Sequence, residues 1–216
     1  MKHVARIMLM LTMGGGMQLA FAQTAYQLPF ASAGNGIELT VVNVSGLPLS
    51  GVTVEATALP GWLKFKTTRQ NLPALKADQE VPVLFTFSVD KSAPVNEAQT
   101  IVFTINSKNG QSWSKQIKVT VAPPEKFELF QNYPNPFNPT TTISYQLPAD
   151  SRVTLKIFNM LGQEVATVVD ETRPAGYHQE VWDGSRISTG VYVYALVAAD
   201  AQGNRQVGRK KMLLLK

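Results

Sequence analysis

The chain has 216 residues, 2 histidines, no cysteine, and a formal net charge of +5 from 20 Lys and Arg against 15 Asp and Glu. A chain of this length forms one or two domains. The lack of cysteine excludes a disulfide framework, a thiol nucleophile, a Cys-ligated metal and a lipid-modified cysteine, and two histidines are too few for a histidine-based catalytic cluster.

Residues 1–22 are a predicted secretory signal peptide. Lys2 and Arg6 form a positive n-region, residues 7–13 are an apolar run, and Ala20-Phe21-Ala22 is an A-x-A cleavage site. A transmembrane anchor is the alternative, but three glycines interrupt the run, and spanning a bilayer takes about 20 apolar residues. Loss of Lys2 and Arg6 leaves 18 basic against 15 acidic residues, a mature charge of +3. No later stretch approaches the length of a spanning helix, so we expect a soluble mature protein.

Residues 23–122 are the predicted passenger domain. Apolar and polar residues alternate in five short segments bounded by Gly, Pro, Asn and Asp, which is the period of a β-strand. The expected strands cover 37–41, 52–56, 81–89, 101–105 and 117–121. Short strands at this spacing predict an antiparallel β-sandwich.

Two consecutive prolines, Pro123 and Pro124, divide the chain. Since proline cannot donate to a sheet ladder, residues 123–126 are an expected linker. The alternation then resumes, with six expected strands at 143–147, 153–157, 165–169, 177–181, 191–199 and 212–215. Residues 127–216 are therefore a second predicted sandwich, which must rely on its aromatic residues because it has no disulfide.

The segment 130–141 is the most unusual stretch of the sequence. Three prolines in six residues, each preceded by Tyr or Asn, force an extended or turned backbone and exclude a helix. Phe137 is an expected apolar plug between two Asn-Pro turns, and a plain proline-rich loop is the alternative. The expected turn residues of this motif are Asn135, Pro136, Phe137, Asn138 and Pro139.

From about Phe127 to Lys216 the chain resembles the type A C-terminal sorting domain of the type IX secretion system of Bacteroidetes-type bacteria. The matching motifs run in order through Asn132–Thr141, Ile143–Tyr145, Val153–Asn159, Leu161–Val165, Gly176, Trp182–Gly184, Ser188–Tyr194 and Lys210–Lys216. The resemblance implies an Ig-like β-sandwich that carries a periplasmic protein to an outer-membrane translocon. It also implies processing machinery that removes the domain and, in some members, attachment of the cargo to lipopolysaccharide. A more distant resemblance to the Ig-like domain of flagellar hook-capping proteins concerns the fold only.

The same resemblance carries recognition over to Gly190, Tyr192, Lys211 and Lys216. In physical terms, a final strand at a sheet edge can accept a strand from a receptor. Cations around the last strand would then steer it toward an acidic receptor. They are Arg209, Lys210, Lys211 and Lys216. The alternative is that these charges only keep an edge strand from aggregating.

Residues 25–122 resemble Ig-like modules of the NEW3/CARDB type at 43–46, 59–62 and 81–89. In that interpretation Trp62 packs onto the sandwich. The alternative function is a carbohydrate-binding accessory module, in which Trp62 and Trp113 stack on sugar faces. Trp113 has the same strand parity as Ile117 and Val119, which favours the core.

We find no catalytic set in the sequence. The six acidic residues of the passenger mostly alternate with apolar residues or lie in turns, where a glycosidase pair would need a defined separation in a cleft. His178 has no partner histidine and is expected at an exposed strand position. The sequence also lacks a Gly-rich phosphate loop and a nucleophile elbow. Its charge is spread evenly, unlike a nucleic-acid footprint.

These observations predict an all-β chain of two tandem Ig-like antiparallel β-sandwiches after an N-terminal signal peptide. We expect a non-enzymatic protein with no cofactor or metal, secreted or displayed at the cell surface by way of the periplasm. The expected partners are the type IX translocon, its C-terminal processing machinery, and an unknown surface protein or glycan.

Overall fold

A computed structural model describes residues 4–44, 46–108, 110 and 112–216 apart from 12–24, and for residues 4–11 it describes the backbone alone. Every regular element in this described part is a β-strand, which confirms the predicted all-β class. The chain divides into two compact units, residues 1–122 and 123–216. Most of the predicted signal peptide, residues 1–3 and 12–22, lies outside the described residues.

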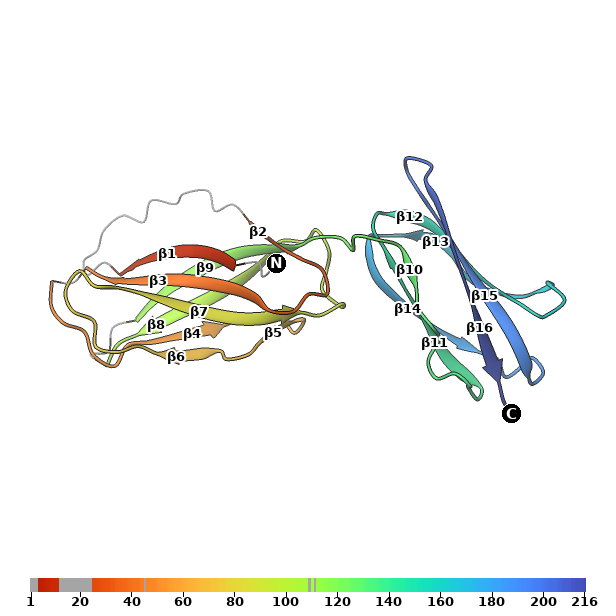
Figure 1. Ribbon diagram of the computed structural model, residues 1–216, viewed down its shortest axis with the longest axis horizontal. Helices are drawn as coiled ribbons and strands as arrows, with labels where there is room; N and C mark the ends of the chain where they lie inside the picture. Colours follow the sequence, from red (N-terminus) through yellow and green to blue (C-terminus); the bar gives the residue numbers. More distant parts are fainter. Residues whose placement is uncertain (1–3, 12–24, 45, 109, 111) are drawn as a thin grey trace. The chain divides into compact units, whose positions relative to one another are not determined.

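The N-terminal unit contains two sheets (Figure 1). One has the strand order β1-β3-β7-β5 and the other the order β2-β9-β8-β4-β6. The strands are β1 (Val4–Leu11), β2 (Tyr26–Leu28), β3 (Asn35–Asn43), β4 (Thr53–Thr57), β5 (Leu63–Phe65), β6 (Arg69–Asn71), β7 (Glu80–Val89), β8 (Gln99–Asn106) and β9 (Ser112–Val121). The five strands expected from alternation are present as β3, β4, β7, β8 and β9, and the alternation missed the three-residue strands β2, β5 and β6.

Side chains from both sheets meet in one core. Phe85 on β7 and Phe103 on β8 come from different sheets, and their ring centroids lie 5.1 Å apart with both side chains fully buried. Phe65 on β5 is only partly buried and stacks on Phe87 at 5.2 Å. This aromatic group places the period-2 apolar residues of both sheets on the same interior, as their alternation predicts.

β1 is formed by residues that the sequence assigns to the leader. It pairs in parallel with β3, from Val4 opposite Gly36 to Leu11 opposite Asn43. Such an apolar run has the composition of a buried strand, so it can occupy a free sheet edge.

Asn43 ends β3 and is a fully buried polar residue. Its Nδ2 donates hydrogen bonds to the carbonyl oxygens of Leu47 (2.8 Å), Leu75 (3.1 Å) and Lys76 (2.9 Å). One side chain thus ties the end of the strand to two connecting segments.

The C-terminal unit also contains two sheets, with the orders β10-β11-β14 and β13-β12-β15-β16. The strands are β10 (Glu128–Leu129), β11 (Thr140–Leu147), β12 (Ser151–Phe158), β13 (Glu164–Arg173), β14 (Gly176–Asp183), β15 (Gly190–Asp200) and β16 (Arg205–Leu214). Tyr145 from the first sheet and Tyr194 from the second are fully buried in one core. All six expected strands are present, but β16 begins seven residues before the expected start at Met212.

The buried bonds of Asn43 generate a test. Replacing Asn43 with alanine should lower the free energy of unfolding of the N-terminal unit by about 2–3 kcal/mol, because three hydrogen bonds donated by a fully buried side chain are lost. Urea denaturation measures this loss. Gln70→Ala is the matched control: Gln70 Nε2 also donates to a carbonyl, that of Leu84 at 2.6 Å, but at an exposed position, so the expected loss is under about 1 kcal/mol. Equal losses in both variants would contradict this account of Asn43.

Candidate functional site

The proline-rich segment lies along the outer edge of the last strand. We call residues 131–139 the signature loop. The Phe137 N–H donates to the Leu213 carbonyl at 3.0 Å, and the Leu215 N–H donates to the Phe137 carbonyl at 3.0 Å. Asn135 Oδ1 accepts from the Leu213 N–H at 2.9 Å. A segment that the sequence identified as a turn motif therefore acts as a short neighbouring strand for β16.

Phe137 holds the loop in place as the predicted apolar plug. Its side chain is buried, and its ring centroid lies 5.6 Å from that of Trp182 on β14. Gly184 follows this tryptophan, and its N–H donates to the Pro139 carbonyl at 2.9 Å. A Cβ at position 184 would come within 3.2 Å of Leu214 and 3.3 Å of Phe137. The Trp-Asp-Gly motif thus supplies a ring for the plug and the space in which the loop meets β16.

A buried polar network fixes the start of the loop. The Asn132 N–H donates to Tyr194 Oη at 2.8 Å, and Tyr194 Oη donates to the Phe130 carbonyl at 2.8 Å. Asn132 Nδ2 donates to Thr141 Oγ1 at 2.9 Å and to the Pro134 carbonyl at 3.0 Å. Burial raises the pKa of the Tyr194 hydroxyl to about 12, although the Asn132 N–H acts in the opposite direction. The hydroxyl is neutral at physiological pH and both donates and accepts.

The four residues proposed for recognition differ in where their side chains lie. Gly190 starts β15 opposite Leu214, and a Cβ there would meet only Tyr192, at 3.9 Å. Tyr192 is buried, and its hydroxyl donates to the Ser188 carbonyl at 2.7 Å. Lys216 Nζ donates to the Ser185 carbonyl at 2.7 Å. The Lys211 side chain is exposed, and its backbone carbonyl accepts from Gln131 Nε2 at 2.7 Å.

Of the loop residues proposed as turn positions, only Phe137 is buried. Pro139 is half-buried and accepts the Gly184 N–H, whereas Asn135, Pro136 and Asn138 are exposed. Asn135 nonetheless has a defined role through its bond to Leu213.

The structure changes the expectation of an accessible final strand. β16 does lie at the edge of its sheet, but Gln131, Asn135 and Phe137 already contact its outer edge between Lys211 and Leu215. A receptor strand cannot pair there while the loop is in place. Gly208 is also approached closely, since a Cβ there would lie 2.8 Å from Leu129.

The outer face of β16 carries exposed cations instead. Arg205, Arg209 and Lys211 share the strand parity opposite to that of the buried Met212 and Leu214. Within the described residues these three cations make no ion pair. On β12 of the same sheet, by contrast, Arg152 pairs with Asp170 at 2.8 Å and Lys156 with Glu164 at 2.7 Å.

Two exposed apolar side chains lie on the same face of the sheet as these cations. Val191 on β15 is 41% exposed and Val207 on β16 is 49% exposed. Cations beside exposed apolar side chains make a surface that suits an acidic, partly apolar partner.

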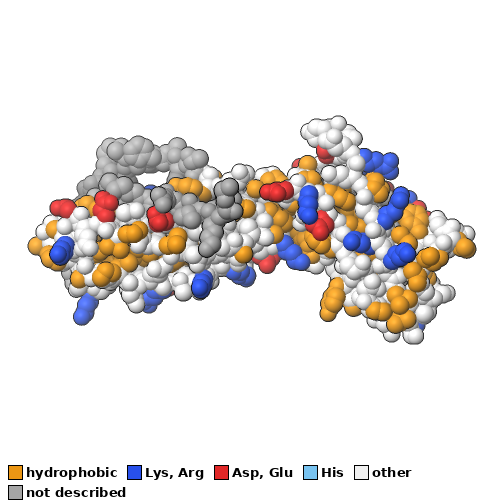
Figure 2. All heavy atoms as spheres, in the orientation of Figure 1, with side chains coloured by type: hydrophobic (Ala, Val, Ile, Leu, Met, Phe, Trp, Pro, Cys, Tyr) orange, Lys and Arg blue, Asp and Glu red, His pale blue; other side chains and the backbone are white. Residues whose placement is uncertain are grey.

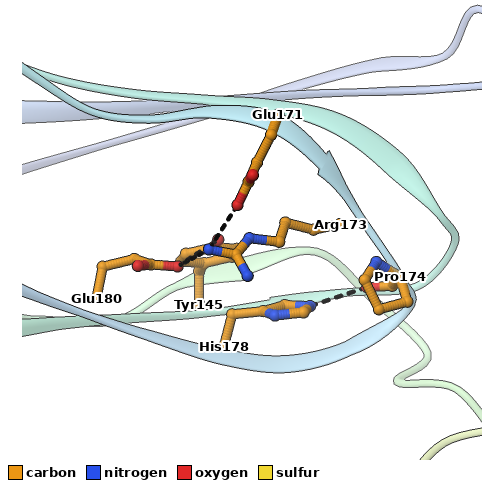
Figure 3. Close-up of polar contacts among 6 residues, drawn as sticks. All are labelled: Tyr145, Glu171, Arg173, Pro174, His178 and Glu180. Carbon is orange, nitrogen blue, oxygen red and sulfur yellow. Dashed lines mark hydrogen bonds and ion pairs between the residues drawn. The ribbon is translucent and has the colours of Figure 1, made fainter.

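A second polar cluster joins the two sheets of this unit (Figure 3). Arg173 Nη2 lies 2.9 Å from Glu180 Oε1 and 2.8 Å from Glu171 Oε1, and Tyr145 Oη donates to Glu180 Oε1 at 3.3 Å. Burial raises the pKa of the Tyr145 hydroxyl, and the Glu180 carboxylate raises it further. The Tyr145 hydroxyl therefore stays protonated at physiological pH. The ion pair between Arg173 on β13 and Glu180 on β14 links the two sheets of the unit.

His178 belongs to the same cluster. Its ring stacks on Tyr145 with centroids 5.2 Å apart, and its Nε2 bonds to the Pro174 carbonyl at 2.8 Å. The side chain is half-buried, which differs from the expected exposed position, because β14 turns this residue toward the core side of its sheet.

The two tryptophans of the alternative sugar platform lie apart. Trp62 lies beside the end of β7, where the Asp90 N–H donates to its carbonyl, and Trp113 lies opposite Ile105 at the far end of β8. Both are partly buried against the N-terminal core. A shallow hollow of this unit is lined by Lys64, Phe65, Lys66 and neighbouring residues, without either tryptophan.

The acidic residues of the N-terminal unit are half-buried or exposed. On the visible face in Figure 2, acidic and basic side chains are dispersed, and neither sign forms a continuous patch. Among the described residues, no group of three or more His, Asp or Glu could hold a metal ion. The described part of the chain also contains no helix that could cross a membrane.

The Tyr194 network generates a pH-dependent prediction. An unfolded tyrosine has a pKa of about 10. Above pH 10 the unfolded chain therefore loses its proton first, and the folded unit loses up to about 1.4 kcal/mol per pH unit until Tyr194 ionises at about 12. Tyr194→Phe should lower stability at pH 7 by about 1–3 kcal/mol, since Asn132 and Phe130 lose their partner. It should also flatten the loss between pH 10 and 12, as followed by urea denaturation at each pH. An unchanged slope would contradict the assigned role.

Two glycines test the loop contact. Gly184→Ala should destabilise the C-terminal unit by about 1–2 kcal/mol, because the added methyl group crowds Phe137 and Leu214. Gly190→Ala is the matched control in the same unit, where the added methyl group makes only ordinary contact and the expected change is within about 0.5 kcal/mol. Thermal unfolding of both variants compares them, and a Gly184→Ala protein as stable as the Gly190→Ala protein would refute the crowding.

Comparison with known proteins assigns the C-terminal unit. No curated protein matches the chain. Dimeric latent PorU from Porphyromonas gingivalis is similar over 92% of this chain and 19% of that chain, with 13% identity and a TM-score of 0.36. The E. coli chaperone DraB is similar over 89% of this chain and 95% of that chain, with 16% identity and a TM-score of 0.31. This chain thus spans under a fifth of the PorU chain, and both TM-scores are too low to assign a function.

The family model of the secretion system C-terminal sorting domain matches residues 131–209, which include the signature loop and the first half of β16. The C-terminal unit therefore belongs to the type IX secretion C-terminal sorting domains, and it marks the chain as a substrate for export.

Proposed function

We propose that the chain is a non-enzymatic protein of the cell surface or the secreted fraction, with an Ig-like β-sandwich passenger in residues 23–122 and an Ig-like sorting sandwich in residues 127–216. Residues 1–22 are removed as a signal peptide, and the protein crosses the periplasm before the type IX translocon exports it. Its further partners are the C-terminal processing machinery and a surface protein or glycan.

This proposal rests on the hydrogen bonds by which the signature loop holds the edge of β16. The family match begins at Gln131, which is also the first loop residue to contact the edge of β16. The residues that define the family motif therefore support the last strand and hold it in a fixed position. A rigid, loop-supported strand suits a sorting signal that a receptor reads by shape and charge.

The two-sheet architecture supports the Ig-like assignment of both units. Each unit has two sheets whose apolar faces contribute to a single core. In the N-terminal unit most contacts between neighbouring strands are antiparallel, with β1 and β2 as the parallel additions. The dispersed carboxylates favour a binding or structural passenger over a hydrolase.

We place recognition on the outer face of β16. Arg205, Arg209 and Lys211 are exposed there and make no ion pair among the described residues, so desolvating them against an acidic receptor breaks no internal contact. Lys216 and Tyr192, whose side chains are engaged within the unit, position the strand.

The sorting role is tested with the unit as the structure delimits it. Residues 123–216, fused behind a signal peptide and a reporter in a type IX-competent host, should carry the reporter to the surface or the medium. Cell fractionation measures its location. A reporter that remains in the periplasm would overturn the sorting function.

The recognition surface has its own test in the full chain. The triple variant replaces three cations with glutamine: Arg205→Gln, Arg209→Gln and Lys211→Gln. It should reduce export several-fold because these charges no longer attract an acidic receptor. The urea midpoint of unfolding should stay unchanged, because exposed charges contribute little to stability. The control variant Arg152→Gln with Lys156→Gln removes two cations of the same sheet that are already paired, and its export should stay normal. Normal export of the triple variant would show that recognition lies elsewhere.

A further inference from the structure

The N-terminal unit has one long strand edge among several short ones. The edge strands β2, β5 and β6 have three residues each, and short edge strands are a common protection against unwanted pairing. β3 has nine residues and is an inner strand only because β1 lies beside it. Without β1, β3 would form the outer edge of its sheet.

The edge of β3 offers a regular row of hydrogen-bonding groups. The Asn43 N–H donates to the Gln79 carbonyl at 3.0 Å, and the Asn43 carbonyl accepts from the Asp78 N–H at 2.7 Å, so this residue faces the β7 side. Because backbone direction alternates along a strand, the groups of Gly36, Glu38, Thr40 and Val42 face the β1 side.

The usual protections of an edge strand are missing from β3. It has no proline, and Glu38 is its one charged residue. Its register with β7 runs without a shift from Asn35 to Val42, so no bulge interrupts it. A long, regular edge with one charge is a template for pairing with another chain.

The strand now seated there indicates what the edge accepts. Eight consecutive residues of β1 pair with β3 in parallel, again without a shift. The register places Ala5, Ile7 and Leu9 opposite the buried residues Ile37, Leu39 and Val41. It places Arg6 opposite Glu38. A fitting strand thus has apolar residues in register with Ile37, Leu39 and Val41 and one basic residue in register with Glu38.

The rest of the N-terminal segment cannot replace β1. Tyr26–Leu28 forms β2, which pairs with β9 in the other sheet. The next residues form the turn into β3, where Ser32 Oγ donates to the Pro29 carbonyl and the Ser32 carbonyl accepts from the Val89 N–H. Residues 25–34 are therefore already engaged when residues 1–22 are gone.

We propose that the β3 edge of the exported chain is a strand-acceptor site for an extended apolar segment of another protein, which runs parallel to β3 and carries a basic residue opposite Glu38. This inference rests on the proposed removal of residues 1–22. A second copy of the chain fits less well, because two β3 strands related by a two-fold axis run antiparallel and bring no cation to Glu38.

The test uses residues 23–216 and, as the probe, a fluorescein-labelled peptide with the sequence of residues 4–11 followed by Gly-Lys-Lys. Fluorescence anisotropy should show saturable binding, and hydrogen exchange should slow at the amides of residues 36–42. Thr40→Pro removes an N–H that faces the edge and breaks no bond to β7, so it should weaken binding about tenfold or more. Thr40→Ala keeps this N–H and should bind within about twofold of the unchanged chain.

Exchanging the charges at Glu38 of the protein and Arg6 of the probe gives a second binding test. This test does not depend on whether Thr40→Pro folds. Glu38→Lys should weaken binding of the probe by about tenfold, and a probe with Arg6→Glu should restore it. No binding by the unchanged chain, equal binding by Thr40→Pro, or no restoration by the exchanged pair would overturn the inference. A dimer of residues 23–216 in analytical ultracentrifugation that Thr40→Pro abolishes would also overturn it, in favour of a second copy as occupant.

A separate measurement tests the proposed removal of residues 1–22. N-terminal sequencing of the exported protein should begin at Gln23. A sequence that begins at Met1 would show that the leader remains and refute the removal on which the inference rests. Absence of peptide binding to residues 23–216 would refute the acceptor site alone.

Discussion

The pairing of Phe137 with Leu213 and Leu215 is the contact on which the C-terminal unit depends. Two backbone hydrogen bonds of 3.0 Å join the signature loop to β16, and the buried Phe137 ring anchors the loop against Trp182. A strand paired on one side only would present a row of free backbone groups. The loop satisfies part of that row, so the last strand is held from both sides where its buried residues enter the core.

Three further residues of the sorting unit, Asn132, Tyr194 and Gly184, support this contact. Asn132 and Tyr194 fix the first residues of the loop through bonds that the interior leaves no water to replace. Gly184 leaves the space in which the loop and β16 meet. Several separate segments of the family signature therefore meet at this one structural contact.

The alternation of apolar and polar residues predicted most of the fold. It identified β3 and β7 because each buries one face along many residues, and it missed β5 and β6 because three residues are too short to show a period. The accessible edge of β16, expected from the resemblance to sorting domains, is partly covered by the loop. Sequence periodicity carries no information on which distant segment lies beside an edge, so the bond from Asn135 to Leu213 could not be inferred.

Single side chains were predicted less well than strands. Phe137 was expected to be a plug, since an isolated aromatic residue between prolines has few other ways to avoid water. His178 was expected to be exposed because it has no partner histidine in the sequence. Its actual contacts, the Tyr145 ring and the Pro174 carbonyl, depend on strand register and on a turn, which a count of histidines does not reveal.

The two units differ in which residues cover the edges of β16 and β3, and this difference fits their proposed roles. In the sorting unit, residues of the same unit cover the edge of β16 near Leu213, and the cationic outer face of that strand stays exposed. In the N-terminal unit, the long edge of β3 is covered by residues that the proposed export removes. Removal would expose backbone donors and acceptors only on the passenger, after its synthesis as a precursor. The outer face of β16 would thus be the same before and after residues 1–22 are removed, whereas the β3 edge would become available only after their removal. Loss of the same residues therefore connects the proposed export with the proposed acceptor site.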